Sequence, residues 1–238
     1  MGDLLINLLA SIIAGTAVWL AQFAIRRRRL NRERAFFGLT AGATSLLVAS
    51  RHASSPREHS IHRGDVAALV ELATIVRECG ARADLVGGGQ PVRELGRVAE
   101  FCVGGPGANP RAATHLRAVL RGVTYTVSEW PTHGDDAKLA FAVGGHEYVR
   151  TPETEYAVLA RFWGPTGGRP ALYLGGLTAG GNLATARYLA NHHRELFRRF
   201  GADRPFCLVL RIQEPAAYGT DFTEIVADVT DVAFTPQE

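Results

Sequence analysis

The stretches FCVGGPGAN at residues 101–109 and ALYLGGLTAGGN at residues 171–182 share one pattern. In each, a short apolar run is followed by a double glycine, and an asparagine stands just before a helical pattern. An asparagine at that place can cap the first amides of a helix, and glycine lets the backbone approach a neighbour closely. The pattern predicts two turns that lead from a strand into a helix.

Such a turn is a candidate anion site, because the start of a helix offers unpaired N–H groups and the positive end of its dipole. On neighbouring parallel strands, both turns would face the carboxyl edge of the sheet, where open α/β folds place ligands. Neither turn fits GxGxxG, and GxxxxGK[ST] is absent, so neither an ordinary dinucleotide fingerprint nor a P-loop is predicted. The alternative is that the glycines serve only tight turns. The candidate ligand-binding residues in these turns are Gly104, Gly105, Asn109, Gly175, Gly176, Gly181 and Asn182.

Strand-like runs and helical patterns alternate around these turns, which is typical of a parallel α/β sheet. The fold class expected is α/β, a Rossmann-like three-layer mixed sheet over residues 45–238. Strands are expected at 45–50, 83–86, 101–103, 171–174 and 206–212, and helices at 61–80, 91–99, 109–120 and 181–200. Three runs without long helices between them are expected as antiparallel additions to the sheet: 123–129, 138–143 and 155–163. A closing edge strand is expected at 225–232.

Other polar residues are expected near the same edge. Arg51 and His52 follow the first strand, where Arg51 could pair with a phosphate or carboxylate. Glu214 follows a later strand and is the first candidate for a general base. Glu155 would reach the edge if its strand runs antiparallel, whereas Glu100 starts its strand about 13 Å from the turn.

No metal site is predicted, and the sequence names no cofactor. His52, His59 and His62 lie in a loop without the spacing or the acidic partner of a zinc motif. The cysteines do not form a CxxC motif or an even-numbered framework. They are expected to be small, buried core residues with free thiols: Cys79, Cys102 and Cys207.

The N-terminal part predicts a membrane anchor. Residues 4–25 are 22 residues without a charge, and as a helix they would extend about 33 Å, enough to cross a bilayer core. A cleaved signal peptide normally has a basic leader, but here the leader contains Asp3 and the arginines follow the apolar run. By the positive-inside rule, the domain is expected in the cytoplasm, below a plasma or bacterial inner membrane. Residues 35–44 are expected as a linker.

The charge distribution supports a lipid partner rather than a nucleic acid. The chain has 26 basic and 23 acidic residues, and residues 1–34 include six of the basic and two of the acidic ones. The remainder is therefore close to neutral, without the spread of basic groups that binds phosphate backbones. The segment 26–34 can attract anionic lipid headgroups. Small residues four apart, such as Ser11 and Gly15, would permit a homo-oligomer.

The turns also resemble a known type of domain. The chain resembles a family of membrane-anchored Rossmann-like α/β domains in bacterial proteins, which has no established activity. The resemblance is in three features: GGPxxN after one strand, a Glu-Tyr pair that opens a later strand, and a second glycine-rich turn. The resemblance covers about residues 45–232. Where the family pattern has Asp-Tyr-Gly, this chain has Glu155-Tyr156-Ala157. A looser, fold-level similarity links it to nucleotide-sensing and NAD-cleaving domains of bacterial defence systems. The matching residues are Gly104, Gly105, Pro106, Asn109, Glu155, Tyr156, Gly175, Gly176, Gly180, Gly181 and Ala184.

Three functional hypotheses follow from the sequence. In the first, a membrane-tethered cytosolic module binds a nucleotide or another phosphorylated small molecule at the paired turns and acts as a sensor. In the second, the domain hydrolyses an N-glycosidic or phosphate bond, with Glu214 or Glu155 as the catalytic carboxylate. In the third, it is a structural or protein-interaction domain whose glycine turns only serve folding.

Overall fold

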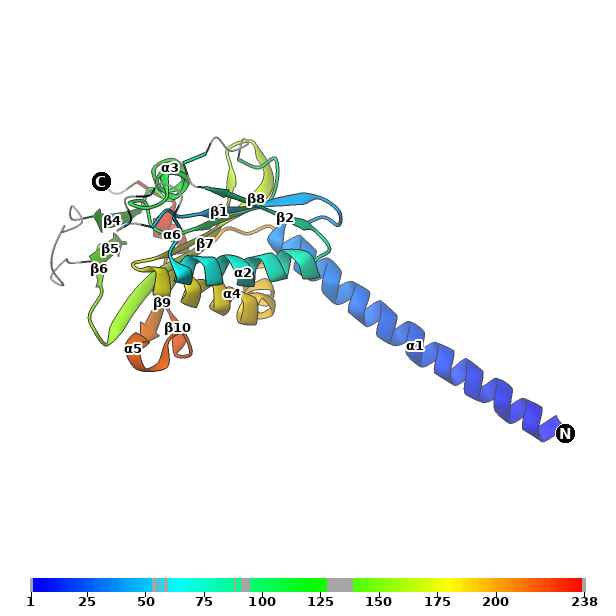
Figure 1. Cartoon of the computed structure of the whole chain (residues 1–238). Coiled ribbons are helices and arrows are strands. Elements are labelled where there is room, and N and C mark those ends of the chain that lie inside the picture. Colours follow the sequence, from blue (N-terminus) through cyan, green and yellow to red (C-terminus); the bar gives the residue numbers. More distant parts are fainter. Residues whose placement is uncertain are drawn as a thin grey trace.

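The computed structural model describes residues 2–52, 55, 57, 60–87, 89–90, 95–127 and 139–236. In helix α1 (Gly2–Phe37), side chains are described at residue 13 and from residue 15 onward. Figure 1 shows a mixed α/β domain, with α1 projecting from one side of it.

A seven-stranded mixed sheet forms the centre of the domain, in the order β10-β9-β7-β8-β3-β1-β2. β1, β2, β3, β8 and β9 point the same way, whereas β7 and β10 are antiparallel to their neighbours. The five parallel strands therefore end at one edge, which contains both glycine turns and is called the turn edge below. Its strands are β1 (Thr44–Ala49), β2 (Arg82–Gly87), β3 (Glu100–Val103), β7 (Thr154–Gly164), β8 (Gly167–Gly176), β9 (Phe206–Gln213) and β10 (Thr223–Asp228).

Both faces of this sheet are covered, which confirms the expected α/β class with three layers. Helices α2 (Arg63–Glu78) and α4 (Ala179–Phe200) pack on one face. Residues of α3, of a small second sheet and of α6 pack with the other face. Because the central strands are buried on both sides, they are nearly continuous apolar runs. The elements on the second face are α3 (Pro110–Ala118), β4 (Val123–Val127), β5 (Leu139–Val143), β6 (His146–Val149) and α6 (Thr230–Ala233).

Local sequence explains where α2 begins and ends. The ring nitrogen Nδ1 of His62 accepts a hydrogen bond from the amide of Gly64 at 3.1 Å and so caps the first turn. Gly80 follows the helix with φ +72°, a conformation that favours glycine and stops a helix. The buried side chains between these ends recur at helical spacing: Ala68, Leu69, Leu72, Ile75 and Val76.

The expected antiparallel additions are only partly correct. β7 joins the main sheet between β8 and β9, but β5 pairs with β4 on one side and with β6 on the other in a separate three-stranded sheet. The turn at Gly144 and Gly145, both with positive φ, connects β5 directly to β6, so these strands pair locally.

Two smaller expectations are also wrong. The closing strand ends at Asp228, whose carboxylate accepts the amide of Thr230 at 3.1 Å, and residues 230–233 form α6. The short helix expected at 91–99 is absent from residues 95–98, which form turns, while 91–94 lie outside the described residues.

The segment expected as a linker is part of the packed domain. α1 continues to Phe37, and Phe36 and Phe37 are 0% and 1% exposed. Their rings lie 6.2 Å from Phe206 and 5.9 Å from Phe101, respectively. Burying two aromatic rings outweighs the flexibility suggested by the nearby glycines. Among the residues that the structure describes, no helix has the length and apolar composition of a membrane span.

Candidate functional site

The two glycine turns lie side by side. β3 and β8 are parallel neighbours, with Val103 opposite Leu174, and the amide of Gly104 donates to the carbonyl of Leu174 at 2.9 Å. Gly104 has φ +100°, and a Cβ there would lie 2.7 Å from the Cβ of Ser50. The prediction that both turns face the same edge is therefore confirmed.

The first turn is capped by its asparagine, as the sequence predicts. The side-chain oxygen of Asn109 accepts the amides of Arg111 at 3.0 Å and Ala112 at 3.3 Å. Its side-chain nitrogen donates to the carbonyl of Val103 at 2.8 Å. One fully buried side chain thus forms hydrogen bonds with the last carbonyl of β3 and with the first amides of α3.

The second turn is built differently, and the cap expected at Asn182 is wrong. The N-cap of α4 is Thr178, whose hydroxyl accepts the amides of Gly180 and Gly181. Asn182 lies inside the first helical turn, where its side-chain oxygen accepts the amide of Gly176 at 2.6 Å. The hydroxyl of Thr178, four residues before this asparagine, takes the cap position instead, because threonine is also a favourable cap residue.

Asn182 belongs to a buried polar chain that connects three elements. Its side-chain nitrogen donates to the Asp65 carboxylate at 2.7 Å. The other Asp65 oxygen accepts the hydroxyl of Ser50 at 2.8 Å. All three side chains are less than 5% exposed. The chain joins the end of β1, the start of α2 and the start of α4, which sequence spacing could not reveal.

Glu155 occupies the N-terminus of α4. β7 runs antiparallel, as this assignment required, and the Glu155 carboxylate accepts the amide and the hydroxyl of Thr178 at 2.8 and 2.9 Å. Burial raises the pKa of Glu155, and hydrogen bonds from Thr178 oppose that increase. A Cβ at Gly181 would overlap the same carboxylate, so Gly181 leaves room for it. The position where an external anion would sit therefore holds the protein's own carboxylate.

Two tyrosines from the α3 face approach the glycines of the turn edge. The hydroxyl of Tyr125 donates to the carbonyl of Gly175 at 2.7 Å. A Cβ at Gly175 would overlap the hydroxyls of Tyr125 and Tyr173, whereas a Cβ at Gly105 would lie 3.6 Å from the nearest atom, the Gly176 carbonyl oxygen. Gly175 is thus required for packing, while Gly105 has room for a side chain.

Arg51, His52 and Glu214 also lie at this edge, but only Arg51 has a described contact with one of the turns. Arg51 is exposed, and its amide donates to the carbonyl of Ala108 in the first turn at 2.9 Å. The rings of His52 and His62 lie 5.2 Å apart, while His59 lies outside the described residues. Glu214 is exposed at the end of β9, with β7 between β9 and β8.

Glu214 has an unusual backbone. Its φ is +46°, the only positive value among the described residues other than glycine. It precedes the short helix α5 (Pro215–Tyr218), and its amide donates to the carbonyl of Glu153 at 2.6 Å. Left-handed backbone at a non-glycine residue is costly and often occurs at functional positions.

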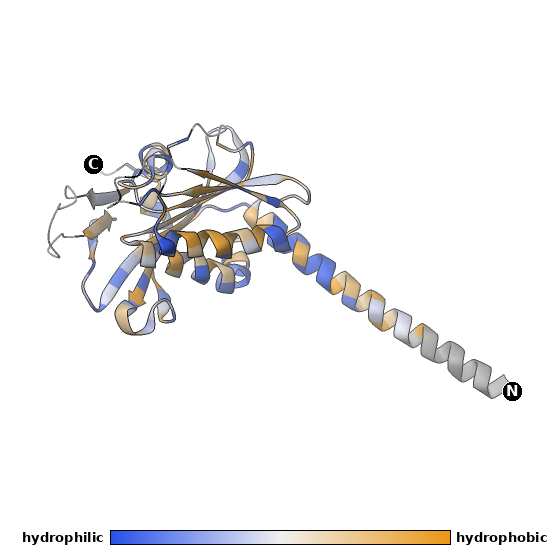
Figure 2. Ribbon diagram, in the orientation of Figure 1, coloured by the Kyte–Doolittle hydropathy of each residue, from blue (hydrophilic) through white to orange (hydrophobic). Residues whose placement is uncertain are grey.

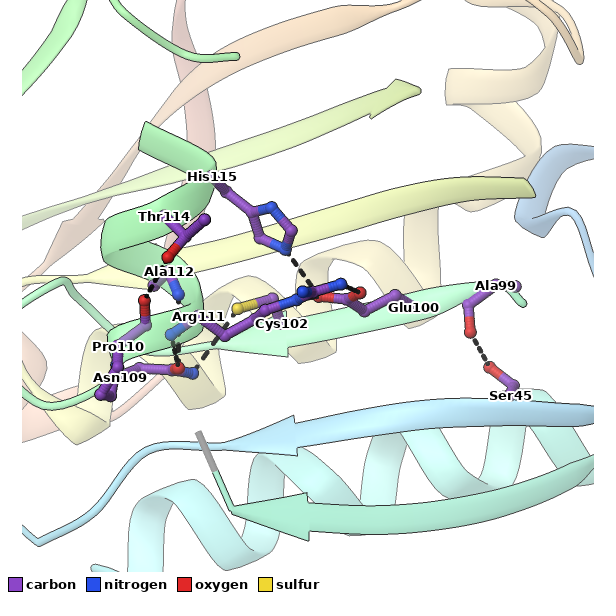
Figure 3. Close-up of polar contacts among 10 residues, drawn as sticks. All are labelled: Ser45, Ala99, Glu100, Cys102, Asn109, Pro110, Arg111, Ala112, Thr114 and His115. Atoms are coloured by element: carbon purple, nitrogen blue, oxygen red, sulfur yellow. Dashed lines mark hydrogen bonds and ion pairs between the residues drawn. The ribbon is translucent and has the colours of Figure 1, made fainter. Parts of the chain in front are cut away.

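A buried cluster lies at the other end of β3, around Glu100, which the sequence placed away from the turns (Figure 3). The Glu100 carboxylate accepts Nε and Nη2 of Arg111 at 3.0 and 2.7 Å and lies 2.6 Å from Nε2 of His115. Burial alone would raise the pKa of Glu100, but the hydrogen bonds from His115 and Arg111 lower it to about 2. The signal in the sequence is Arg111 and His115, four residues apart on one face of a short helix.

Glu100, Cys102 and His115 bring three possible metal-ligand atoms within 4.8 Å of one another. Arg111 binds Glu100 through two nitrogens, so its guanidinium already neutralises the carboxylate. Burial also raises the pKa of the Cys102 thiol well above its usual range, which keeps it protonated. All three side chains are at most 2% exposed, so a substrate could not reach them. The cluster is best explained as a buried link between β3 and α3.

Two hollows formed by described residues lie away from the turns. One of about 410 Å³ is bordered by residues of β5, β6 and α6, including His146, Tyr148 and Asp231. Another of about 150 Å³ lies where α1, α2 and α4 meet. No family model, curated protein or solved structure matches this chain. The resemblance to membrane-anchored bacterial domains therefore stays a prediction.

Proposed function

We propose that this protein is a membrane-tethered scaffold module, in which α1 is a single-pass anchor and the α/β domain is a structural or protein-interaction unit in the cytoplasm. The observation that carries the scaffold role is the turn edge. Its helix starts are already occupied by Asn109, Thr178 and Glu155. Asn182 binds the amide of Gly176 at the end of β8. The groups that would bind a phosphate in a nucleotide-binding turn instead bind the protein itself.

The composition of α1 supports the anchor. Residues 4–25 have no charge, and the large apolar side chains described in this segment are at least half exposed. Figure 2 shows the hydrophilic arginine segment next to the domain and more hydrophobic residues farther out. Apolar side chains exposed around a helix need a non-aqueous environment. The large exposed side chains are Ile13, Val18, Trp19, Leu20, Phe23 and Ile25.

The inner end of α1 is attached to the domain by a buried cation, Arg161 of β7. Its guanidinium donates to the carbonyls of Phe36 at 3.1 Å, Gly201 at 3.0 Å and Arg204 at 2.6 Å. Phe36 and Gly201 lie at the C-terminal ends of α1 and α4, where a positive charge is favoured by the helix dipoles. The guanidinium also stacks on the ring of Phe36 at 4.5 Å. These contacts support an anchor that is continuous with the core.

The scaffold role can be tested by titrating the full chain, in a mild detergent, against a panel of nucleotides and phosphorylated metabolites. No binding of any compound in the panel is expected. Gly105→Ala is the matched variant, because it adds a methyl group at the turn edge without a steric overlap. Calorimetric binding that Gly105→Ala abolishes, in a variant of unchanged stability, would contradict the scaffold role and support a ligand site.

The second candidate is the nucleotide-binding or hydrolytic function, and the left-handed backbone of Glu214 favours it. The exposed carboxylate of Glu214 and the exposed Arg51 both lie at the turn edge, although on separate strands. This candidate predicts turnover of NAD or nucleosides that disappears in Glu214→Gln. Absence of turnover by the unmodified full chain, measured by chromatography of the products, would remove the hydrolytic function. Absence of binding in the calorimetric titration would remove the nucleotide-binding function.

A further inference from the structure

The edge of the domain next to α1 is rich in exposed arginines. The parallel strands begin at this edge, and α2 and α4 end there, on the side of the domain from which α1 projects (Figure 1). The exposed acidic side chains nearby are Glu78, Asp84, Glu195 and Asp203. The six exposed arginines, called the basic edge below, are Arg77, Arg82, Arg97, Arg169, Arg198 and Arg204.

These arginines come from six separate segments. They stand in the last turns of α2 and α4, at the starts of β2 and β8, and in the turns before β3 and β9. Other arginines of this region have acidic partners and are not counted: Arg199 with Asp228, and Arg194 with Glu33. The fold therefore gathers cationic groups that are dispersed in the sequence.

The attachment of α1 fixes which side of the domain faces the anchor. Phe36 and Phe37 are buried in the core, and Arg161 binds the last turn of α1. A helix held in this way cannot swing freely around the domain. The basic edge therefore stays beside the arginine segment 26–34 of α1.

The dimensions bring this edge close to lipid headgroups. Residues 26–37 extend α1 by roughly 17 Å beyond the apolar segment. The headgroup layer takes up about 5–8 Å of that length, and a Debye length of about 8 Å covers much of the remainder. A tilt of about 20°, common for membrane helices, brings one side of the edge nearer still.

We propose that the basic edge is a second membrane contact, which binds anionic lipid headgroups and holds the domain against the bilayer with the turn edge facing the cytoplasm. This inference rests on the proposed anchoring by α1. Each basic group near an anionic surface strengthens the attraction, and the arginine segment of α1 acts on the same surface. The orientation would leave the exposed side chains of the turn edge accessible to a partner.

The test uses the full chain in nanodiscs of phosphatidylcholine alone or with added phosphatidylserine. A fluorophore is attached at Thr166→Cys, an exposed position in the turn between β7 and β8 on the α1 side. Labelling is selective because the three native cysteines are buried and burial raises the pKa of Cys79 to about 11. Energy transfer to a headgroup-attached acceptor reports how close this edge lies to the membrane.

Transfer is expected to increase when phosphatidylserine is present. The charge-reversal pair Arg82→Glu and Arg198→Glu should return it to the level in neutral discs. The matched control pair is Arg57→Glu and Arg63→Glu, two exposed arginines outside the basic edge, and it should keep the increase. Equal transfer in both lipids, or equal loss in both pairs, would overturn the inference. For a label at Ala216→Cys in α5, at the turn edge, energy transfer should change little when phosphatidylserine is added.

A separate measurement distinguishes failure of the proposed anchor from failure of the proposed lipid contact of the basic edge. Flotation of the full chain with neutral vesicles tests the insertion of α1 without any anionic lipid. A chain that does not float contradicts the anchor, and the inference with it. A chain that floats but shows no dependence of energy transfer on phosphatidylserine contradicts only the basic edge.

Discussion

The starts of α3 and α4 follow the same sequence pattern but are stabilised in different ways. α3 is capped by Asn109 alone, and the Glu100 carboxylate holds the helix from the side through Arg111 and His115. α4 is capped by Thr178, with the Glu155 carboxylate at its N-terminus and the Asn182–Asp65–Ser50 chain beside it. Similar turns can thus share a backbone role while their polar partners differ completely.

The two glutamates show the difference most clearly. Glu100 faces an arginine and a histidine, which lower its pKa to about 2, whereas Glu155 faces neutral donors of Thr178, and burial raises its pKa. Cationic hydrogen-bond partners stabilise the ionised form of Glu100. The hydrogen bonds from Thr178 and the charge of Arg150 favour the ionised form of Glu155 less than burial disfavours it. The attachments of α3 and α4 to these two carboxylates should therefore respond in opposite ways to pH.

The largest expected effect is at the glycine that touches α4. In Gly176→Ala, the new Cβ would lie 2.5 Å from the amide nitrogen of Asn182, so the backbone must shift. We expect a loss of stability on the order of 4 kcal/mol, or failure to fold. Chemical unfolding of the full chain in mild detergent measures it. Gly105→Ala is the control and should change stability by less than about 1 kcal/mol; equal losses would contradict the difference between the turns.

The two asparagines should also differ. Asn182→Ala leaves the Gly176 amide and an Asp65 oxygen without their partner in the interior, which should cost about 3 kcal/mol. Asn109→Ala removes a cap and should cost about 1–2 kcal/mol. Unfolding midpoints of both variants, measured together, check the order. A larger loss for Asn109→Ala would indicate that the Asp65 chain contributes little.

Acid should weaken the α3 side of the domain. The folded-state pKa of Glu100 is lowered from 4.5 to about 2, so its contribution is fully present above the unfolded value and is lost as pH falls through that range. The shift corresponds to about 3 kcal/mol. Urea unfolding at pH 6 and pH 3 should show a loss of about 2 kcal/mol from this group in the unmodified chain, because pH 3 is still above the folded-state pKa, and a smaller loss in Glu100→Gln. An unchanged pH dependence would contradict the assignment.

The smallest expected effect is the pH dependence of stability that comes from Glu155, and its sign is opposite to that of Glu100. Because burial raises its folded-state pKa, its contribution is fully present below the unfolded value and falls as pH rises through the folded one. In a Glu100→Gln background, stability should decline slightly from pH 4 towards pH 7. Adding Glu155→Gln should flatten that decline. A decline that persists in the double variant would assign it to another group.

Much of the fold could be predicted because local periodicity is strong. The alternation of buried apolar strands with helices, the two strand-to-helix turns and the cap at Asn109 all depend on residues close together in the chain. The pairing of β4 with β5 and β6 away from the main sheet was not predictable, since an isolated apolar run does not reveal its neighbour.

The site was less predictable for the same reason. Glu155 could be placed at the turn edge only conditionally, because its position depends on the direction of β7. The links from Asp65 to Asn182 and from Glu100 to Arg111 join residues that are 117 and 11 positions apart. Residues 35–44 are expected as a linker because they lie between the arginine segment and the first strand. Phe36 and Phe37 of this segment are nevertheless buried in the core.

By itself, the sequence determined the α/β class, the glycine turns and the separation of an uncharged N-terminal segment from a nearly neutral domain. These properties follow from composition and short-range spacing, which act before any distant contact forms. Only the tertiary structure decided that the helix starts are occupied by the protein's own side chains and that α1 is continuous with the core. Those outcomes depend on which buried polar groups meet, because each must find a partner once water is excluded.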